Sequence, residues 1–220
     1  MPRKRPTLER PAGAAGNRTK DPQRRRQNII DAALKLFAQK GVSATSIRDI
    51  VQLSGESLST VYYYFDDKED LFITVMTESA LRAIQPVLEA EADARGDAVA
   101  RLKRLLSAYT TFMIENPESS MMVIRGLLRI LEHENTPFVQ VMVDRFQAIQ
   151  ELVKEGYRKG EVEKVPEDLF AFCFVGLVIV YFFANLVAGS VEGWPFRPFK
   201  EKEFLGFVDR SLLSVLRKRE

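Results

Sequence analysis

The stretch TSIRDIVQLSGESLSTVYYYF, residues 45–65, predicts two short helices joined by a tight turn. Thr45 or Ser46 can cap the first helix, and Asp49 follows Ser46 by three residues, as in a capping box. Gly55 then interrupts that helix. Two helices separated by a turn of three to four residues that contains glycine make a helix-turn-helix motif.

Three adjacent tyrosines, Tyr62, Tyr63 and Tyr64, lie in the second of these helices. Successive helical residues point about 100° apart, so the three rings cannot all be buried in one core. Val61 and Phe65 are four residues apart and can therefore point inward together. If one tyrosine also packs inward, we expect it to be Tyr62, with its hydroxyl in water. The remaining rings are then free for a partner.

Helical patterns flank this motif on both sides. Residues 21–22 are Asp-Pro, which is typical of an N-cap followed by proline at the first helical position. Apolar residues recur at helical spacing over 29–37, and Gly41 provides the C-cap. Residues 66–76 begin with carboxylates and continue with an apolar face, which predicts a fourth helix that Pro86 limits or kinks.

Every later apolar segment also has helical spacing, and none alternates as a strand does. The last segment, residues 199–219, predicts a helix that closes the chain. The sequence therefore predicts an all-α protein. We expect a disordered basic arm over 1–21, a helix-turn-helix domain over 22–83 and a second helical domain over 84–220.

Charge is distributed unevenly along the 220 residues. Residues 1–27 contain nine Lys and Arg against two acidic residues, a net charge of +7; since the whole chain carries +2, the remainder carries −5. A basic arm on a mildly acidic body favours a polyanionic partner, although charged tails are also often simply solvated. The single cysteine, Cys173, cannot form an intramolecular disulfide, which favours a reducing, cytoplasmic setting. The N-terminus lacks the apolar run of a secretory signal.

The ordered series IIDAALKLFAQKG, ATSIRDIVQLSG, STVYYYF and KEDLF, within residues 24–72, closely resembles the N-terminal domain of the TetR (tetracycline-repressor) family of bacterial transcriptional regulators. The resemblance implies an N-terminal three-helix DNA-binding domain and a C-terminal helical ligand-binding and dimerisation domain. It also implies a homodimeric repressor that a small hydrophobic ligand releases from double-stranded DNA. Many relatives have Lys and Gly where this chain has Leu58 and Ser59, which points to a different operator sequence.

The same resemblance assigns DNA contacts. It places Tyr62 at a base edge and Tyr63 and Tyr64 at phosphates, while Arg48 can reach a guanine unless it is simply solvated. Lys68 matches a phosphate-contacting lysine, beside two repelling aspartates. The expected DNA-binding residues are Thr45, Ser46, Arg48, Ser57, Leu58, Ser59, Thr60, Tyr62, Tyr63, Tyr64 and Lys68. The arm residues Arg3, Lys4 and Arg5 resemble groups that enter a minor groove.

Residues 169–188 are apolar except for Gly176 and Asn185, long enough to span a bilayer. A membrane-tethered regulator is therefore an alternative. A helix that is apolar on all sides can equally lie between its own core and a second subunit. The resemblance favours the latter, with no membrane, through a dimer interface made by residues 166–189 and 203–218. Small residues at 176, 184, 188 and 189 permit close approach.

A ligand pocket is expected among the middle helices, because methionine and aromatic side chains adapt to apolar ligands. The candidate lining residues are Met113, Met121, Met122, Phe138, Met142, Phe146 and Phe174, each of which is also compatible with ordinary core packing. An all-α enzyme is a further, weaker alternative. His133 is the only histidine, Cys173 lies in an apolar run, and neither a phosphate-binding loop nor a metal-binding motif is present. We therefore expect no catalytic residues, metal or cofactor.

Overall fold

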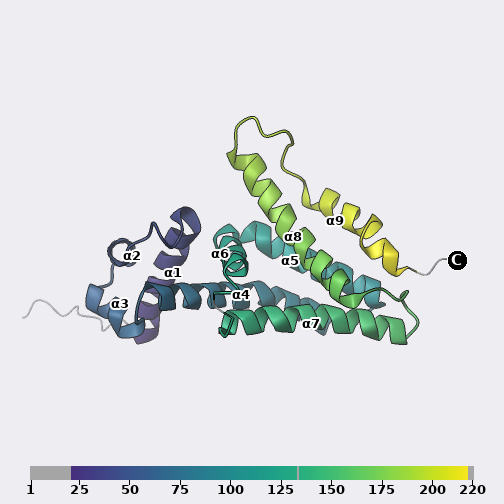
Figure 1. Cartoon of the computed structure of the whole chain (residues 1–220), viewed down its shortest axis with the longest axis horizontal. Coiled ribbons are helices and arrows are strands. Elements are labelled where there is room, and N and C mark those ends of the chain that lie inside the picture. Colours follow the sequence, from purple (N-terminus) through teal and green to yellow (C-terminus); the bar gives the residue numbers. More distant parts are fainter. Residues whose placement is uncertain (1–20, 133, 218–220) are drawn as a thin grey trace, which may run out of the picture.

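The computed structural model describes residues 21–132 and 134–217, and all regular structure within these ranges is helical (Figure 1). The predicted all-α class is confirmed. The helices are α1 (Pro22–Lys40), α2 (Ile47–Ser54), α3 (Leu58–Tyr64), α4 (Lys68–Ala92), α5 (Ala98–Glu115), α6 (Pro117–Leu128), α7 (Pro137–Arg158), α8 (Glu167–Ser190), α9 (Glu201–Arg210) and the 3-10 helix η1 (Leu213–Leu216). Apart from Asp21, the predicted arm over 1–21, with Arg3, Lys4 and Arg5, lies outside the described residues, as does His133.

Local signals account for the first helices. The Asp21 carboxylate accepts a hydrogen bond from the backbone N–H two residues later and caps α1. Ser46 and Asp49 form a reciprocal capping box at the start of α2. Gly41 and Gly55, with φ of +83° and +68°, end α1 and α2 in conformations that a side chain would strain. The predicted starts and ends of these two helices are therefore confirmed.

One apolar core joins α1, α2, α3 and the first half of α4. Its centre comprises Ile29, Ile30, Ala33, Phe37, Ile50, Val61, Phe65, Leu71, Phe72 and Met76, all at most 3% exposed. Val61 and Phe65 point inward, as predicted from their spacing. The rings of Phe37 and Phe72 meet edge to face with centroids 5.9 Å apart. These contacts anchor α3 by its inner face and leave its outer face free.

Helix α4 links this core to the rest of the molecule. It continues through Pro86 to Ala92, so of the two expected effects of Pro86, ending the helix was wrong, and a kink stays a prediction. A proline inside a helix costs roughly 3 kcal/mol. Ile84 and Val87, on either side, are buried, and their packing holds the helix together. The helix therefore crosses the expected domain boundary between residues 83 and 84 without a break.

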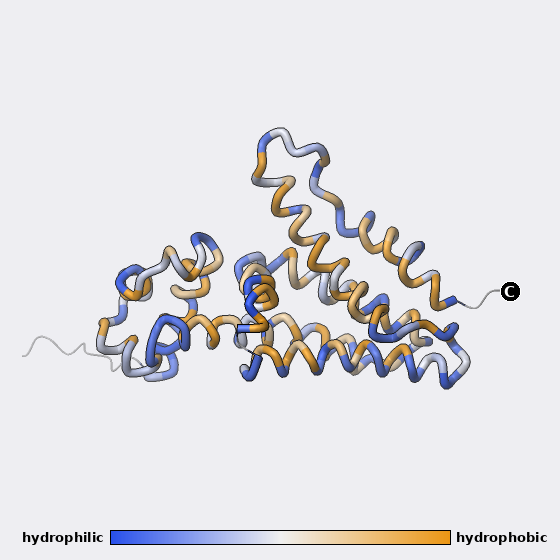
Figure 2. Tube along the Cα trace, viewed as in Figure 1, coloured by the Kyte–Doolittle hydropathy of each residue, from blue (hydrophilic) through white to orange (hydrophobic). Residues whose placement is uncertain are grey.

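A second core lies between α5, α7, α8 and the two C-terminal helices. Helix α8 is hydrophobic along most of its length (Figure 2). Helices α4 and α8 are both long and apolar enough to cross a membrane, by length and composition alone. In α8 only 33% of the most apolar window is buried within the chain, so much of that helix is exposed.

The C-terminal helix is shorter than predicted. Instead of one helix over 199–219, α9 ends at Arg210, and η1 follows after a turn at Ser211. The turn brings Leu213 and Leu216 to 0% exposure in the second core. It also lets the Leu216 carbonyl accept a hydrogen bond from the backbone N–H of Glu163, 2.9 Å away. Burial of two leucines therefore outweighs continuation of the helix.

Candidate functional site

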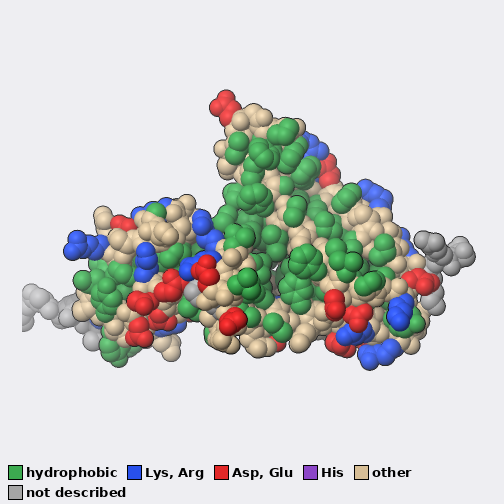
Figure 3. Space-filling model, viewed as in Figure 1, with side chains coloured by type: hydrophobic (Ala, Val, Ile, Leu, Met, Phe, Trp, Pro, Cys, Tyr) green, Lys and Arg blue, Asp and Glu red, His purple; other side chains and the backbone are tan. Residues whose placement is uncertain are grey.

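Helix α3 presents its outer face to solvent at one end of the molecule. Tyr62 is 54% exposed, Tyr63 is 80% exposed and Leu58 is 46% exposed. Side chains of the hydrophobic class, which includes tyrosine, form a patch at this end of the surface, beside Lys, Arg, Asp and Glu side chains (Figure 3). Since exposing large apolar groups is unfavourable unless a partner covers them, this face has the character of a binding surface.

Tyr64 behaves differently from its neighbours. Its hydroxyl donates a hydrogen bond to the Pro22 carbonyl, 2.9 Å away, and its ring packs partly against the N-terminal core. The Tyr63 ring meets it edge to face with centroids 4.9 Å apart. Tyr64, and not Tyr62, is therefore the tyrosine that packs inward. The reason is tertiary: the start of α1 lies beside the end of α3 and offers a carbonyl there.

Hydroxyl groups gather at the N-terminus of α3. The Ser57 hydroxyl accepts a hydrogen bond from the Thr60 backbone N–H at 3.0 Å, which caps the helix. It also lies 2.8 Å from the Ser59 hydroxyl and 2.7 Å from the Thr60 hydroxyl. Ser57, Leu58 and Ser59 are exposed, and Thr60 is half-buried. The expected contact residues of α3 are thus brought together around one exposed helix start.

Helix α2 contributes an exposed cation and an exposed cap. Arg48 forms no ion pair with any residue that the structure describes, so its guanidinium is free for a partner. Ser46 is exposed at the helix start. Asp49 pairs with Lys40 at 2.8 Å, and this hydrogen bond, with others from Ser46, lowers the pKa of Asp49 to about 2. The Asp49 carboxylate is therefore ionised and pairs with Lys40, and does not pair with Arg48.

Two expected contact residues have other roles in the structure. Thr45 is 1% exposed, and its hydroxyl donates to the Gly41 carbonyl at 2.7 Å, so it neither caps α2 nor reaches the surface. The ammonium of Lys68 donates to the carbonyls of Val42 at 2.8 Å and Thr45 at 2.9 Å. These bonds tie the α1–α2 loop to the start of α4. Both residues therefore hold the loop in place by donating to its backbone carbonyls.

The structure adds a basic residue that we did not single out from the sequence. Arg25 lines a shallow groove between the start of α1 and α3, together with Ser59, Tyr63 and Tyr64. The sequence signal was the run of three arginines at 24–26, which we counted only in the net charge of residues 1–27. Its position beside α3 depends on how α1 packs, which the run itself does not reveal.

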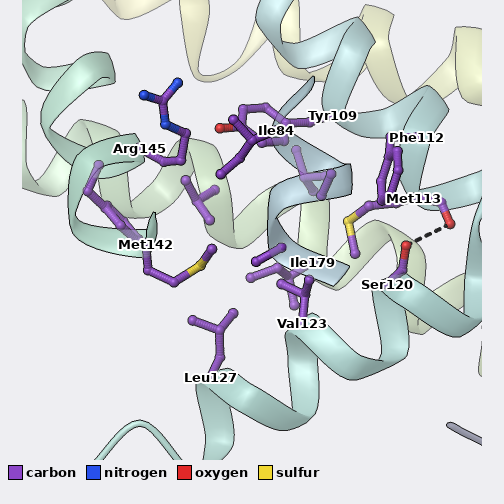
Figure 4. A pocket seen from close by; sticks show the side chains of 15 residues that line it. Ile84, Tyr109, Phe112, Met113, Ser120, Val123, Leu127, Met142, Arg145 and Ile179 are labelled. Atoms are coloured by element: carbon purple, nitrogen blue, oxygen red, sulfur yellow. Dashed lines mark hydrogen bonds between the residues drawn. The ribbon is translucent and has the colours of Figure 1, made fainter. Parts of the chain in front are cut away.

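A second candidate site is a narrow cavity of about 70 Å³ enclosed by α4, α5, α6, α7 and α8 (Figure 4). Of the expected lining residues, Met113, Met142 and Phe146 form part of its wall. The residues that we did not predict are Ala80, Ala83, Ile84, Tyr109, Phe112, Ser120, Val123, Leu127, Arg145, Val175, Val178 and Ile179. The wall is therefore mainly aliphatic and aromatic, as small-molecule pockets are.

Four expected lining residues are not in this wall. Met122, Phe138 and Phe174 are each 0% exposed within the two cores, and Met121 packs half-buried against the second core. On α6 the cavity face comprises Ser120, Val123 and Leu127, spaced by three and four residues. The two methionines of that helix therefore point in other directions. Residue type suggested a lining role, but helical phase excluded it.

The cavity has a polar end. The Tyr109 hydroxyl and the Arg145 guanidinium lie at the same end (Figure 4), and Arg145 Nη1 pairs with Glu91 Oε2 at 3.0 Å. Burial raises the pKa of Tyr109 well above its ordinary value, and Glu91 adds to this while the Arg145 charge opposes it. The Tyr109 hydroxyl therefore stays protonated. The Ser120 hydroxyl, elsewhere in the wall, donates to the Met113 carbonyl at 3.2 Å.

The outer face of α8 is a third exposed apolar surface. Leu169, Phe172, Val180 and Phe183 are 60%, 68%, 63% and 54% exposed, and their spacing places them along one side of the helix. Gly176 lies on the same side, where an added Cβ would meet nothing within 4 Å. Figure 3 shows hydrophobic side chains gathered over this helix. The row is continuous over most of α8.

Residues 29–75 match the model of a family described as bacterial regulatory proteins, tetR family. The match spans α2, α3 and the parts of α1 and α4 that pack on them. The chain belongs to the TetR family. It is 29% identical over 184 residues to the HTH-type transcriptional regulator AcrR of Shigella flexneri, and the alignment covers 80% of each chain. It is 30% identical over 103 residues to the HTH-type transcriptional repressor NicS of Pseudomonas putida, covering 47% of this chain and 48% of NicS.

Solved TetR-like structures share the fold along most of the chain. The fatty acid degradation regulator FadR from Bacillus halodurans superposes with a TM-score of 0.72 at 21% identity, covering 91% of this chain and 99% of that one. FadR from Bacillus subtilis, solved in complex with stearoyl-CoA, has a TM-score of 0.68 at 17% identity, covering 89% and 100%. As a member of the TetR family, this chain is a DNA-binding transcriptional regulator.

Proposed function

We propose that two copies of this chain act in the cytoplasm as a non-enzymatic repressor that reads a symmetric operator through their α3 helices. Residues 22–83 supply the DNA-binding domain and 84–220 the ligand-binding and dimerisation domain, with α4 shared between them. The observation that carries the proposal is the two-sided character of α3: Val61 and Phe65 are buried, whereas Tyr62 and Tyr63 are exposed. A helix held in this way can enter a major groove without unfolding its own core.

The chemistry of this surface suits duplex DNA. The free guanidinium of Arg48 can donate two hydrogen bonds to a guanine edge. The Tyr62 ring can contact a thymine methyl, while the hydroxyls at the start of α3 and the guanidinium of Arg25 suit phosphates. Thr45 and Lys68, which are engaged inside the domain, support the surface indirectly.

Dimerisation is proposed through the outer face of α8 and the neighbouring α9. The exposed row on α8 is too apolar to remain in water without a partner, and Gly176 leaves room for a second helix at its centre. Phe172→Glu is expected to convert the dimer to monomer in sedimentation velocity. Leu131→Glu, at an 89% exposed position after α6, is the matched control and should leave the dimer intact. A dimer that survives Phe172→Glu would refute this interface.

The cavity is proposed to bind a small apolar effector. Its wall supports this, as does the structural likeness to a FadR solved with stearoyl-CoA. Helix α4 contributes Ile84 to the cavity and Phe72 to the N-terminal core, so a shift of α4 moves both sites. Two α3 helices match a duplex only when they are about 34–36 Å apart. A ligand that favours another spacing lowers operator affinity.

Footprinting on the DNA upstream of the chain's own gene, followed by titration with variants, tests the DNA assignment. Arg48→Ala and Tyr62→Ala are each expected to weaken operator binding by about 1–3 kcal/mol, roughly 5- to 150-fold. Tyr157→Ala, a 49% exposed tyrosine of α7, is the matched control and should not change affinity. Wild-type affinity in both α3 and α2 variants would refute the proposed surface.

A further inference from the structure

One charged side chain belongs to the otherwise apolar wall of the cavity. Arg145, from α7, is only 17% exposed, and its ion-pair partner Glu91, from α4, is 28% exposed. Moving an ion pair from water into a partly buried, apolar setting costs free energy, and only well-aligned charge-assisted hydrogen bonds offset that cost. Arg145 has five donors, and Glu91 takes one of them, at 3.0 Å. The guanidinium is therefore able to bind a further acceptor from the cavity.

A second hydrogen-bond donor lies at the same end of the cavity. The Tyr109 hydroxyl, from α5, has no hydrogen-bond partner among the residues that the structure describes, and it lies at the Arg145 end of the cavity (Figure 4). A half-buried hydroxyl without a partner is unfavourable, so an acceptor in the cavity would stabilise it. Tyr109 and Arg145 together offer donors and positive charge to one point. The rest of the wall, including Ile84, Val123 and Val178, is apolar apart from the Ser120 hydroxyl, which donates to the Met113 carbonyl.

We propose that the effector of this regulator is an amphipathic carboxylic acid, whose slim apolar body fills the cavity and whose carboxylate binds Arg145 and Tyr109 in place of Glu91. The inference rests on the ligand-responsive function proposed above and adds the chemical class of the ligand. A planar carboxylate matches the guanidinium fork and accepts the tyrosine proton as well. A cationic head would be attracted to Glu91 but placed against Arg145. The narrow cavity, about 70 Å³, favours a single chain over a fused ring system, and a chain of about ten carbons must widen it on entering.

Replacement of Glu91 by the ligand carboxylate at Arg145 also couples ligand binding to DNA binding. Glu91 is the penultimate residue of α4, and the same helix begins in the N-terminal core. While Glu91 holds Arg145, the end of α4 is tied to α7. When the ligand carboxylate takes Arg145, the tie to α7 is lost, while Arg104 still holds the Asp93 end of α4 to α5. The charge that recognises the ligand is therefore also one of the groups that restrain the helix between the two sites.

Isothermal titration of the full-length protein with decanoate, decanol and decylamine tests the assignment, because these probes share one tail and differ only in the head. Decanoate is expected to bind at least about tenfold more tightly than either other probe, as a hydrogen bond to a charged group contributes more than a neutral one. Arg145→Met should lower decanoate affinity by about tenfold or more and leave decanol within about threefold. Glu91→Gln should raise decanoate affinity, since it removes the competing carboxylate.

Two controls separate recognition from general destabilisation. Arg101→Met breaks a comparable arginine–glutamate pair, Arg101 with Glu155 at 3.2 Å, outside the cavity wall, and should leave all three affinities unchanged. The double variant Arg145→Met with Glu91→Gln removes both charges, so no unpaired carboxylate remains. It should fold and still bind decanol without preferring decanoate.

Equal binding of the three probes, a preference for decylamine that Glu91→Gln abolishes, or no binding of decanoate at millimolar concentration would each overturn the head-group assignment. Failure of the proposed function gives a different result. If decanoate binds through Arg145 but does not release operator DNA, the assignment stands and the repressor mechanism does not. If decanol releases DNA as well as decanoate does, the repressor mechanism stands and the assignment does not.

Discussion

Gly126 allows α6 to pack closely on α4 and α7, and replacing it with alanine perturbs that contact directly. The added methyl would lie 2.6 Å from Phe138 Cζ and 2.8 Å from Met76 Sδ. Carbon contacts are optimal at about 3.5–4.0 Å, so α6 must shift by roughly 1 Å or the two buried side chains must repack. Overpacking of this kind costs about 1–3 kcal/mol, and the better helix propensity of alanine returns about 0.5–1 kcal/mol. Gly126→Ala should therefore destabilise the protein by about 1–2 kcal/mol.

Thermal unfolding monitored by circular dichroism measures this effect. For a chain of this size, a loss of about 1 kcal/mol lowers Tm by roughly 2–4 °C, so a decrease of about 2–8 °C is expected. Gln147→Ala is the control: Gln147 is exposed in α7, outside the α6 contact and the proposed dimer interface, and Tm should stay constant or rise slightly. If Gly126→Ala raises Tm as the control does, the α6 packing described above is wrong.

Three further perturbations each have an expected direction of effect. The hydrogen bond from Lys40 holds the pKa of Asp49 at about 2, below its ordinary 3.8. The stabilisation that this bond gives is therefore complete above about pH 4 and is lost as pH falls toward 2. Between about pH 4 and pH 2, Tm should fall less for Asp49→Asn than for the wild type. Tyr64→Phe removes a hydrogen bond between α3 and α1 and should lower the free energy of unfolding by about 0.5–1.5 kcal/mol in urea titrations; no change would show that water replaces it. Deleting residues 1–20 should reduce the salt dependence of DNA binding, and an identical slope of log affinity against log salt would show that the arm makes no phosphate contacts.

Helix α6 borders the cavity on one face and packs on α4 and α7 with another. Ser120, Val123 and Leu127 face the cavity, whereas Gly126 faces α4 and α7. Its last turn is close to the DNA-binding domain, since the Arg129 guanidinium lies over the Phe72 ring and pairs with Glu69 at 3.1 Å. A ligand that displaces α6 from the cavity therefore also shifts the start of α4. This effect adds to the loss of the Arg145–Glu91 pair proposed above.

Much of the N-terminal domain was predictable, because its signals are local. A cap, a glycine or an apolar spacing acts within one or two turns of helix, so residues 21–65 identify their own helix ends. The inward positions of Val61 and Phe65 follow from the same periodicity. The role of Tyr64 did not, because the carbonyl that it meets belongs to Pro22, 42 residues away. The DNA contacts themselves remain predictions.

The amino-acid sequence by itself determined the all-α class, the helix-turn-helix and its family resemblance, since each depends on short-range pattern. Only the tertiary structure decided which side chains enclose the cavity, that Arg145 meets Glu91 and lies beside Tyr109 at one end of it, and which row of α8 remains uncovered. Those relations join residues from different helices. They depend on helical phase and packing angle, and a small change in either moves a side chain from a cavity wall into a core.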